Sequence, residues 1–230
     1  MQDLVTPNEL LELPFFSGLT TSDIESLLDR HRLVTIASGQ TLVMEADWGE
    51  SLMVLLSGLA KVRSFSSDGE EIVLSLVGRG DVLGEIALID GRPRSADVVT
   101  LSTVKLLKLN GKSFMRQLQY CNGLALQVAR LQAFRLRDLN RRFSLQRSDA
   151  TTRVLESLAY LACKSSGTDD PLAASVPLPQ GEIAILAGLA RETSSRTMSK
   201  LRQRGIVRDE GGSLRLTSLD PLRKRGLLPS

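Results

Sequence analysis

Residues 179–201 read PQGEIAILAGLARETSSRTMSKL, and this stretch decides how the C-terminal part of the chain folds. Gly188 lies between two segments with helical spacing and allows a tight turn between two helices. Small and apolar residues fall on the inner face of the two segments, at Ile183, Ala184, Ala187, Leu189, Met198 and Leu201. The pattern predicts a helix-turn-helix with a second helix starting at Arg191.

The outer side of the second helix is polar. Arg191, Glu192 and Arg196 project into one sector near its N-terminus, the end that enters the major groove in this motif. Arginine donates to guanine O6 and N7, and glutamate accepts from cytosine N4. Lys200 would neutralise a phosphate. The predicted DNA-binding residues are Gln180, Arg191, Glu192, Thr193, Ser195, Arg196 and Lys200. The alternative is a basic helix that is merely solvated.

Residues 33–110 have a different pattern, with short Val-, Ile- and Leu-rich runs separated by Gly, Asp and Ser. Many short strands at such spacing predict an antiparallel barrel or jelly roll. Ser67-Asp68-Gly69 lies between two apolar runs and predicts a hairpin. Residues 7–31 precede the strands and have the spacing of short helices.

From residue 111 the period becomes helical again. An apolar stripe recurs along one helical face, at Leu124, Val128, Leu131, Leu136, Leu139 and Phe143. A long helix with such a stripe favours a dimer seam that resembles a coiled coil, and the alternative is packing against the barrel of the same chain. A helix from Ser148, a loop over 165–179, the helix-turn-helix and a hairpin around Gly211 then complete a winged helix.

The expected fold is therefore α+β, in three parts. Residues 1–110 form a β-barrel or jelly-roll sensor domain, residues 111–147 a long dimerisation helix, and residues 148–230 a winged helix-turn-helix domain. Charge follows these boundaries. Residues 1–110 carry 9 basic and 16 acidic residues, a balance of −7, whereas residues 111–150 carry 8 and 2, a balance of +6, and residues 151–230 carry 12 and 8, a balance of +4. A polyanionic partner would meet the second half.

Composition excludes several classes of protein. With 2 Cys and 1 His, the composition argues against a structural zinc site and against a cysteine-ligated iron–sulfur cluster, so no metal is expected. No apolar run reaches the length of a membrane span, and the N-terminus lacks a signal sequence, so a cytoplasmic protein is expected. Phosphate-binding and dinucleotide fingerprints are absent, and no nucleophile and base stand at a recognisable spacing. We expect no catalytic residue and no enzymatic activity.

Two motifs resemble the cyclic-AMP receptor protein/FNR family of bacterial regulators. Arg191-Glu192-Thr193-Ser194-Ser195-Arg196 is similar to the family's R-E-T-x-x-R recognition helix. Gly84-Glu85-Ile86-Ala87-Leu88, followed by Arg94-Ser95-Ala96, is similar to its phosphate-binding cassette. The resemblance covers nearly the whole chain and implies a cyclic-nucleotide-binding domain, a long central helix and a winged helix.

The resemblance also implies roles for the cassette. Gly84, Glu85, Ile86, Arg94, Ser95 and Ala96 would line the site for a cyclic nucleotide. Arg94 would pair with the cyclic phosphate, because a guanidinium matches a phosphate in a fork. The Ser95 hydroxyl would donate to the same phosphate, Glu85 would accept from the ribose 2′-hydroxyl, and Gly84 would let the backbone approach the sugar. For Glu85 alone, the other interpretation is a salt bridge at the barrel rim.

Two departures affect the effector. In cyclic-AMP responders the central helix supplies adjacent Thr and Ser to the adenine. Alignment from Gln127 places Arg135 and Leu136 there, whereas alignment from Arg153 places Asp138 and Leu139 there, and residues 124–143 contain no hydroxyl side chain. Ala46 also stands where a glycine is common in the barrel's Gly-Asp turn.

The sequence thus predicts a homodimeric transcription regulator that binds a two-fold symmetric DNA site with TGTGA-like half-sites and contacts RNA polymerase. No cofactor is expected. The candidate effectors are cyclic AMP, another cyclic nucleotide, a cyclic dinucleotide, a different metabolite, or none. Two alternatives are a nucleotide-sensing protein-interaction module and a family member that binds DNA without a cyclic nucleotide.

Overall fold

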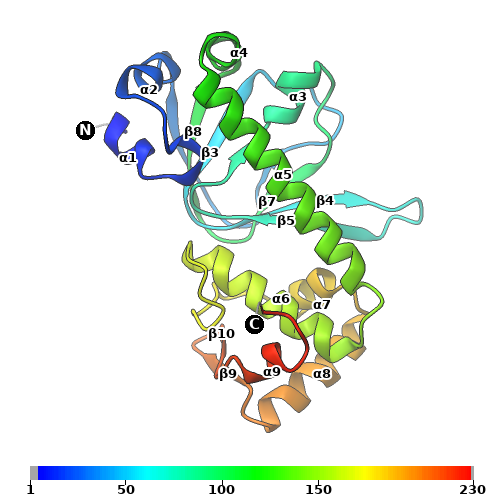
Figure 1. The fold of residues 1–230 in the computed structure, drawn as a ribbon. Coiled ribbons are helices and arrows are strands. Elements are labelled where there is room, and N and C mark those ends of the chain that lie inside the picture. Colours follow the sequence, from blue (N-terminus) through cyan, green and yellow to red (C-terminus); the bar gives the residue numbers. More distant parts are fainter. Residues whose placement is uncertain (1–4, 229–230) are drawn as a thin grey trace. The chain divides into compact units, whose positions relative to one another are not determined.

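The computed structural model describes residues 5–228. The chain divides into two compact units, residues 1–60 with 77–138 and residues 61–76 with 139–230 (Figure 1). Short helices open the first unit, as expected for residues 7–31, and comprise α1 (Pro7–Leu11), the 3-10 helix η1 (Pro14–Phe16) and α2 (Thr21–Leu27). Both α1 and α2 begin with a capping box, in which Thr6 and Thr20 exchange hydrogen bonds with Glu9 and Asp23.

Eight strands follow, with one short helix among them. They are β1 (Arg32–Ile36), β2 (Thr41–Val43), β3 (Ser51–Ser57), β4 (Ala60–Phe65), β5 (Glu71–Val77), β6 (Val82–Leu83), β7 (Asp97–Thr100) and β8 (Val104–Asn110), and the helix α3 (Glu85–Asp90) lies between β6 and β7. They form two four-stranded sheets, ordered β1-β8-β3-β6 and β2-β7-β4-β5. Of the two architectures expected, the jelly roll is therefore right and a closed barrel is wrong.

The core of the first unit lies against the first of these sheets. Antiparallel β3 and β8 place Leu52 opposite Leu109 and Val54 opposite Leu107, and all four side chains are buried. Phe16 and Phe114 pack into the same apolar cluster. In the same sheet β3 pairs with β6, with Met53 opposite Leu83, and the cassette begins directly after β6 at Gly84.

The single helix expected over residues 111–147 is two helices. α4 (Gly111–Tyr120) ends at Cys121, whose extended backbone (φ −107°, ψ 97°) breaks the helix, and α5 (Asn122–Leu145) follows at once. A Cβ at Gly123 would lie 3.2 Å from Leu19 Cδ2, so a glycine permits this close approach. Helical periodicity persists across the break, and this is why the sequence pattern did not predict it.

The apolar stripe on α5 divides into two parts. Leu124 and Val128 are buried in the core of the first unit, and Leu131 packs against that core. Leu136, Leu139 and Phe143 are 59%, 52% and 69% exposed. The N-terminal half of the stripe thus packs against its own domain, which was the alternative expected for it, and the C-terminal half is left uncovered in the single chain.

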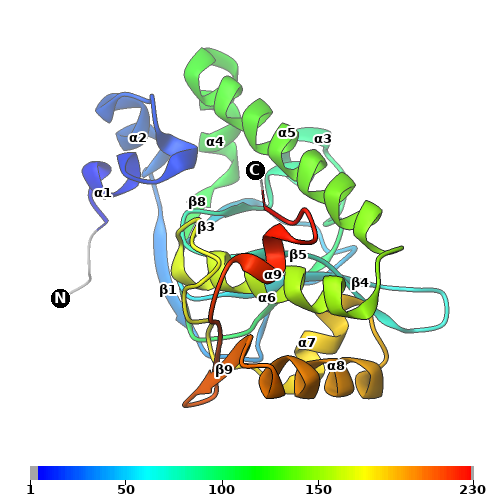
Figure 2. The ribbon, with the colours of Figure 1, turned by 60° about the horizontal axis from the view of Figure 1, so that its bottom comes forward.

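The second unit contains the predicted winged helix. Its elements are α6 (Ala150–Ser166), α7 (Gln180–Ala187), α8 (Arg191–Gln203), β9 (Val207–Glu210), β10 (Ser213–Leu216) and α9 (Asp220–Arg223). Asp149 caps α6, with Oδ1 accepting from the N–H groups of Thr151 and Thr152 at 2.9 and 3.1 Å. α6, α7 and α8 pack against one another (Figures 1 and 2). The predicted order of helices and hairpin is confirmed.

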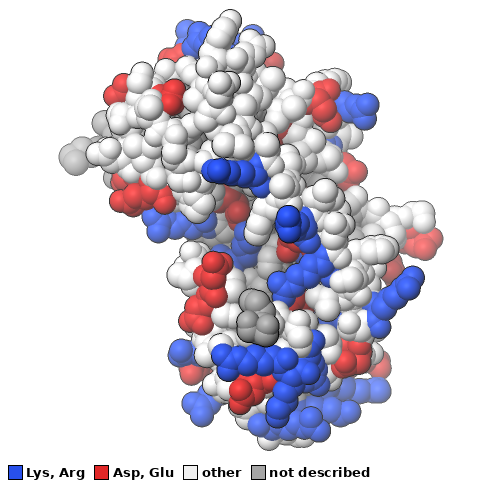
Figure 3. Space-filling view, in the orientation of Figure 1, with Lys and Arg blue, Asp and Glu red and all other residues white. Residues whose placement is uncertain are grey.

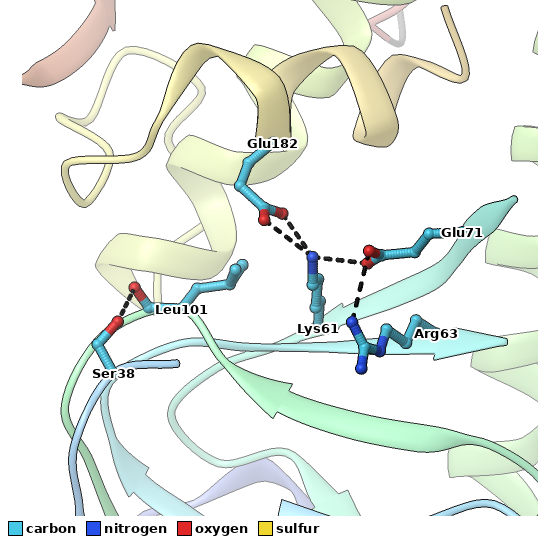
Figure 4. Close-up of polar contacts among 6 residues, drawn as sticks. All are labelled: Ser38, Lys61, Arg63, Glu71, Leu101 and Glu182. Carbon is cyan, nitrogen blue, oxygen red and sulfur yellow. Dashed lines mark hydrogen bonds and ion pairs between the residues drawn. The ribbon is translucent and has the colours of Figure 1, made fainter. Parts of the chain in front are cut away.

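A buried lysine also belongs to the second unit. The Lys61 side chain is 4% exposed, and its Nζ lies 2.9 and 2.7 Å from the two carboxylate oxygens of Glu182 on α7 (Figure 4). Glu71 Oε1 lies 2.6 Å from the same Nζ, and Glu71 Oε2 lies 3.4 Å from Arg63 Nη1. Two carboxylates around one buried ammonium offset its loss of hydration.

Ala46 offers a local test of the backbone. Its φ is +68°, in the left-handed region where a Cβ costs about 1–2 kcal/mol. The residue is held there because its N–H donates to Arg94 O at 2.9 Å.

Ala46→Gly should raise the free energy of unfolding by about 0.5–1 kcal/mol. Denaturant titration followed by the fluorescence of Trp48, the single tryptophan, measures this. Ala129→Gly, at an exposed position on α5, should instead lower stability. A decrease for Ala46→Gly would contradict the strain at this turn.

Candidate DNA-binding surface and ligand site

The turn between α7 and α8 is built around Gly188. This glycine ends α7 in the left-handed conformation (φ +58°), and its N–H donates to the Ala184 and Ile185 carbonyls. Arg153 on α6 donates from Nε to Ala187 O at 2.8 Å and from Nη2 to Gly188 O. The last carbonyls of α7 therefore have partners, and the direction in which α8 leaves the turn is fixed.

α8 has one buried side and one exposed side. Met198 and Leu201 are 2% exposed and pack inward, as predicted from their spacing. All seven side chains predicted to bind DNA are exposed, namely Gln180, Arg191, Glu192, Thr193, Ser195, Arg196 and Lys200. Glu192 Oε2 lies 3.3 Å from Arg196 Nη2, in an i,i+4 pair whose side chains are 82% and 78% exposed. An exposed pair of this kind is weak, so both groups are available to other partners.

Positive charge surrounds the recognition side of this unit. Figure 3 shows blue side chains over the part of the surface where α8 and α9 lie in Figure 1. The exposed basic residues are Arg191, Arg196, Lys200, Arg204, Arg208, Arg215, Arg223, Lys224 and Arg225. Such a surface attracts the phosphates of a duplex and releases their counterions.

Arg94 is the central residue of the cassette. It is 7% exposed, and its guanidinium donates from Nη1 to Gly84 O and from Nη2 to Ser51 O, both at 2.8 Å. A Cβ at Gly49 would overlap Nε, Cζ and Nη2 of Arg94, and a Cβ at Gly84 would overlap Nη1. Burial lowers the pKa of the Arg94 guanidinium, while the nearby Glu85 carboxylate opposes this shift. Two glycines therefore make room for a buried cation held by backbone carbonyls.

Glu85 is the second buried charge of the cassette, 1% exposed at the start of α3. Its Oε1 accepts from Gln132 Nε2 at 2.9 Å and from Arg135 Nη1, and Arg135 Nη2 donates to Val82 O. Its Oε2 is buried and accepts no hydrogen bond within the described residues. An unsatisfied buried carboxylate oxygen is costly and is expected to receive a donor from a ligand.

The structure brings part of the predicted cassette together. Gly84, Glu85 and Arg94 lie around one site. Ala96, two residues after Arg94, is buried, whereas Ile86 and Ser95 are exposed. The role predicted for the Ser95 hydroxyl stays a prediction. Sequence reasoning placed Arg135 at one of two alternative positions facing a base and did not connect it, or Gln132, with Glu85. Their i,i+3 spacing on α5 was the only signal in the sequence.

Two family models match the chain, a cyclic nucleotide-binding domain over residues 33–121 and a Crp-like helix-turn-helix domain over residues 152–225. The chain is also 30% identical to the CRP-like cAMP-activated global transcriptional regulator of Mycobacterium tuberculosis, over 91% of this chain and 95% of that protein. The chain belongs to the CRP/FNR family. It is a DNA-binding transcription regulator with a cyclic-nucleotide-binding domain.

A second relative agrees with this assignment, and a solved structure shares the fold. The Cyclic AMP receptor protein of Thermus thermophilus is 31% identical over 85% of this chain and 88% of its own length. The structure of FixK2 from Bradyrhizobium japonicum shares the fold, with a TM-score of 0.73 at 18% identity over 84% of this chain and 96% of that one. Between residues 5 and 228, no helix combines the length and the apolar character that crossing a bilayer requires.

Proposed function

We propose that this CRP/FNR-family chain acts as a homodimer on a two-fold symmetric operator. Residues 1–110 would sense the effector, the C-terminal half of α5 within residues 111–147 would form the dimer seam, and residues 148–230 would read DNA. Half-sites would lie about one helical turn, roughly 34–36 Å, apart. Arg191, Glu192 and Arg196 would read bases of a TGTGA-like half-site, and Gln180, Thr193, Ser195 and Lys200 would contact the backbone or base edges. Their exposure on α7 and α8 supports these roles.

The effector we propose is a cyclic nucleotide, and one observation carries this proposal. Arg94 and Glu85 are both buried, Arg94 has carbonyls and no carboxylate in hydrogen-bond reach among the described residues, and Glu85 Oε2 lacks a donor. A ligand with an anionic phosphate and a neighbouring hydroxyl would satisfy both groups. A ribose cyclic phosphate has these two groups, with Ile86, Ser95 and Ala96 as further lining residues. The two named relatives are cyclic-AMP proteins.

Control of DNA binding would pass through α5. Gln132 and Arg135 bind Oε1 of the carboxylate whose Oε2 is offered to the ligand. An effector can shift the protein only by binding its DNA-competent state more tightly. Contact with RNA polymerase is part of the proposal, with the loop over residues 165–179 as its surface by analogy with the family.

A gel shift tests the proposal as a whole. Fragments with and without symmetric TGTGA half-sites are titrated with the full chain at a stated salt concentration, in the presence and in the absence of cyclic nucleotide. We expect preference for the symmetric fragment, and tighter binding when effector is present. Equal affinity for all fragments would contradict the proposed operator and favour a protein-interaction module. Specific binding that does not respond to cyclic nucleotide would contradict the proposed effector.

Arg196→Ala tests base reading. A bidentate arginine–guanine contact contributes about 1–3 kcal/mol of discrimination. The variant should lose that much affinity for the symmetric site and tolerate substitution at one base of each half-site. Arg204→Ala, which removes an exposed charge at the end of the same helix, should weaken all sequences alike. Competition gel shifts with single-base variants of the site separate the two effects. Equal losses on specific and random DNA for Arg196→Ala would contradict its role.

A further inference from the structure

Arg135 presents an unused donor edge at the ligand site. Of the five N–H donors of a guanidinium, one binds Glu85 Oε1 and one binds Val82 O. The side chain is 29% exposed, so part of it is open to solvent and to a ligand. Two anchored hydrogen bonds fix the plane of the guanidinium before any ligand arrives, and a fixed fork loses little entropy when it binds a further group.

The position of Arg135 determines which part of a ligand it would meet. A ligand whose phosphate pairs with Arg94 and whose hydroxyl reaches Glu85 Oε2 brings its sugar against the carboxylate that Arg135 holds. The remaining part of a nucleotide is its base, which then lies within reach of α5. On α5, the residues that contact Glu85 are Gln132 and Arg135. The guanidinium of Arg135 has N–H donors and no acceptor.

We propose that Arg135 makes the site selective for a guanine-bearing cyclic nucleotide over cyclic AMP. Guanine presents two adjacent acceptors, N7 and O6, that match a guanidinium fork. Adenine presents N7 beside the N6 amino group, and that donor would face a cation with no acceptor. The proposal rests on the proposed cyclic-nucleotide function and names the base. Cyclic GMP and cyclic di-GMP share this chemistry.

Calorimetric titration of the chain of residues 1–230 with cyclic AMP, cyclic GMP and cyclic di-GMP tests the proposal. We expect cyclic GMP, cyclic di-GMP or both to bind roughly 5- to 150-fold more tightly than cyclic AMP, the range of one bidentate contact. Separate titrations identify which of the two carries the guanine. If cyclic AMP binds as tightly or more tightly, this inference fails and the proposed function stands. If none of the three binds, the proposed function fails as well.

Variants of Arg135 connect the preference to this residue. Arg135→Met removes the fork and should bring the affinities for guanine and adenine nucleotides to within about threefold, whereas Arg130→Met, at an exposed arginine of the same helix, should leave the preference unchanged. Arg135→Lys keeps a cation for Glu85 and loses the fork, so it decides the matter if Arg135→Met does not fold. A guanine preference that survives in both Arg135 variants would overturn the proposal.

Discussion

Gly49→Ala is expected to abolish most of the effector response while leaving the fold in place. Gly49 is not in the left-handed conformation, so its backbone accepts an alanine. The new Cβ would overlap three atoms of the Arg94 guanidinium, and Gly84 closes the other side of the same group. The guanidinium must therefore leave its position between the Gly84 and Ser51 carbonyls. Loss of a charge-assisted contact should weaken cyclic-nucleotide binding by about 1.5–3 kcal/mol.

The effector affinity and the thermal stability of the Gly49→Ala variant are both measured. Calorimetry should show a roughly 10- to 150-fold weaker Kd for the variant. Gly181→Ala is the matched control, because its Cβ meets nothing within 4 Å and its φ is not positive. That control should keep wild-type affinity. Gly49→Ala with unchanged effector affinity would show that Arg94 does not bind the anion.

The DNA-reading surface was predictable from the sequence because it is local. Arg191, Glu192 and Arg196 share one helix, so helical spacing alone places them in one sector, and the structure leaves all three exposed. The turn was predictable for the same reason, since Gly188 occupies a positive φ that other residues avoid. Periodicity works where the partners are a few residues apart.

The ligand site was only half predictable because it joins distant parts of the chain. A motif identified Glu85 and Arg94, but Glu85 is bound by Gln132 and Arg135, 47 and 50 residues further along. Gly49, and Ser51 at the start of β3, complete the cage around Arg94 from another part of the chain. Pairing of this kind depends on the register of the sheet and on where α5 packs, which no local pattern encodes. The helix break at Cys121 was not predictable for a similar reason, because the start of α5 depends on how Gly123 packs against Leu19.

The same limit applies to the apolar stripe of α5, which looks uniform in sequence and is divided in the structure. Leu124 and Val128 are covered by their own domain, whereas Leu136, Leu139 and Phe143 are open to solvent. At 100° per residue these three lie within roughly 60° of one another. Contiguous exposed apolar side chains on a helix indicate a protein partner, and a second copy of the same helix offers a matching stripe. The proposed seam is therefore confined to the C-terminal half of α5.

Leu136→Asp should convert the proposed dimer into monomers. A carboxylate buried at the seam without a partner costs about 3 kcal/mol or more in each protomer, hence about 6 kcal/mol or more per dimer, so the dimer should dissociate at least roughly 10⁴-fold more readily. Leu136 is 59% exposed in the single chain, so the free energy of unfolding of the monomer should change by no more than about 0.5 kcal/mol. Sedimentation velocity measures the dissociation, and Leu136→Met, which keeps an apolar side chain, should remain dimeric. Affinity for the operator should fall when the dimer dissociates, because each half-site then binds the winged helix-turn-helix domain of a separate monomer. A variant that stays dimeric with the aspartate in place would move the seam away from this face of α5.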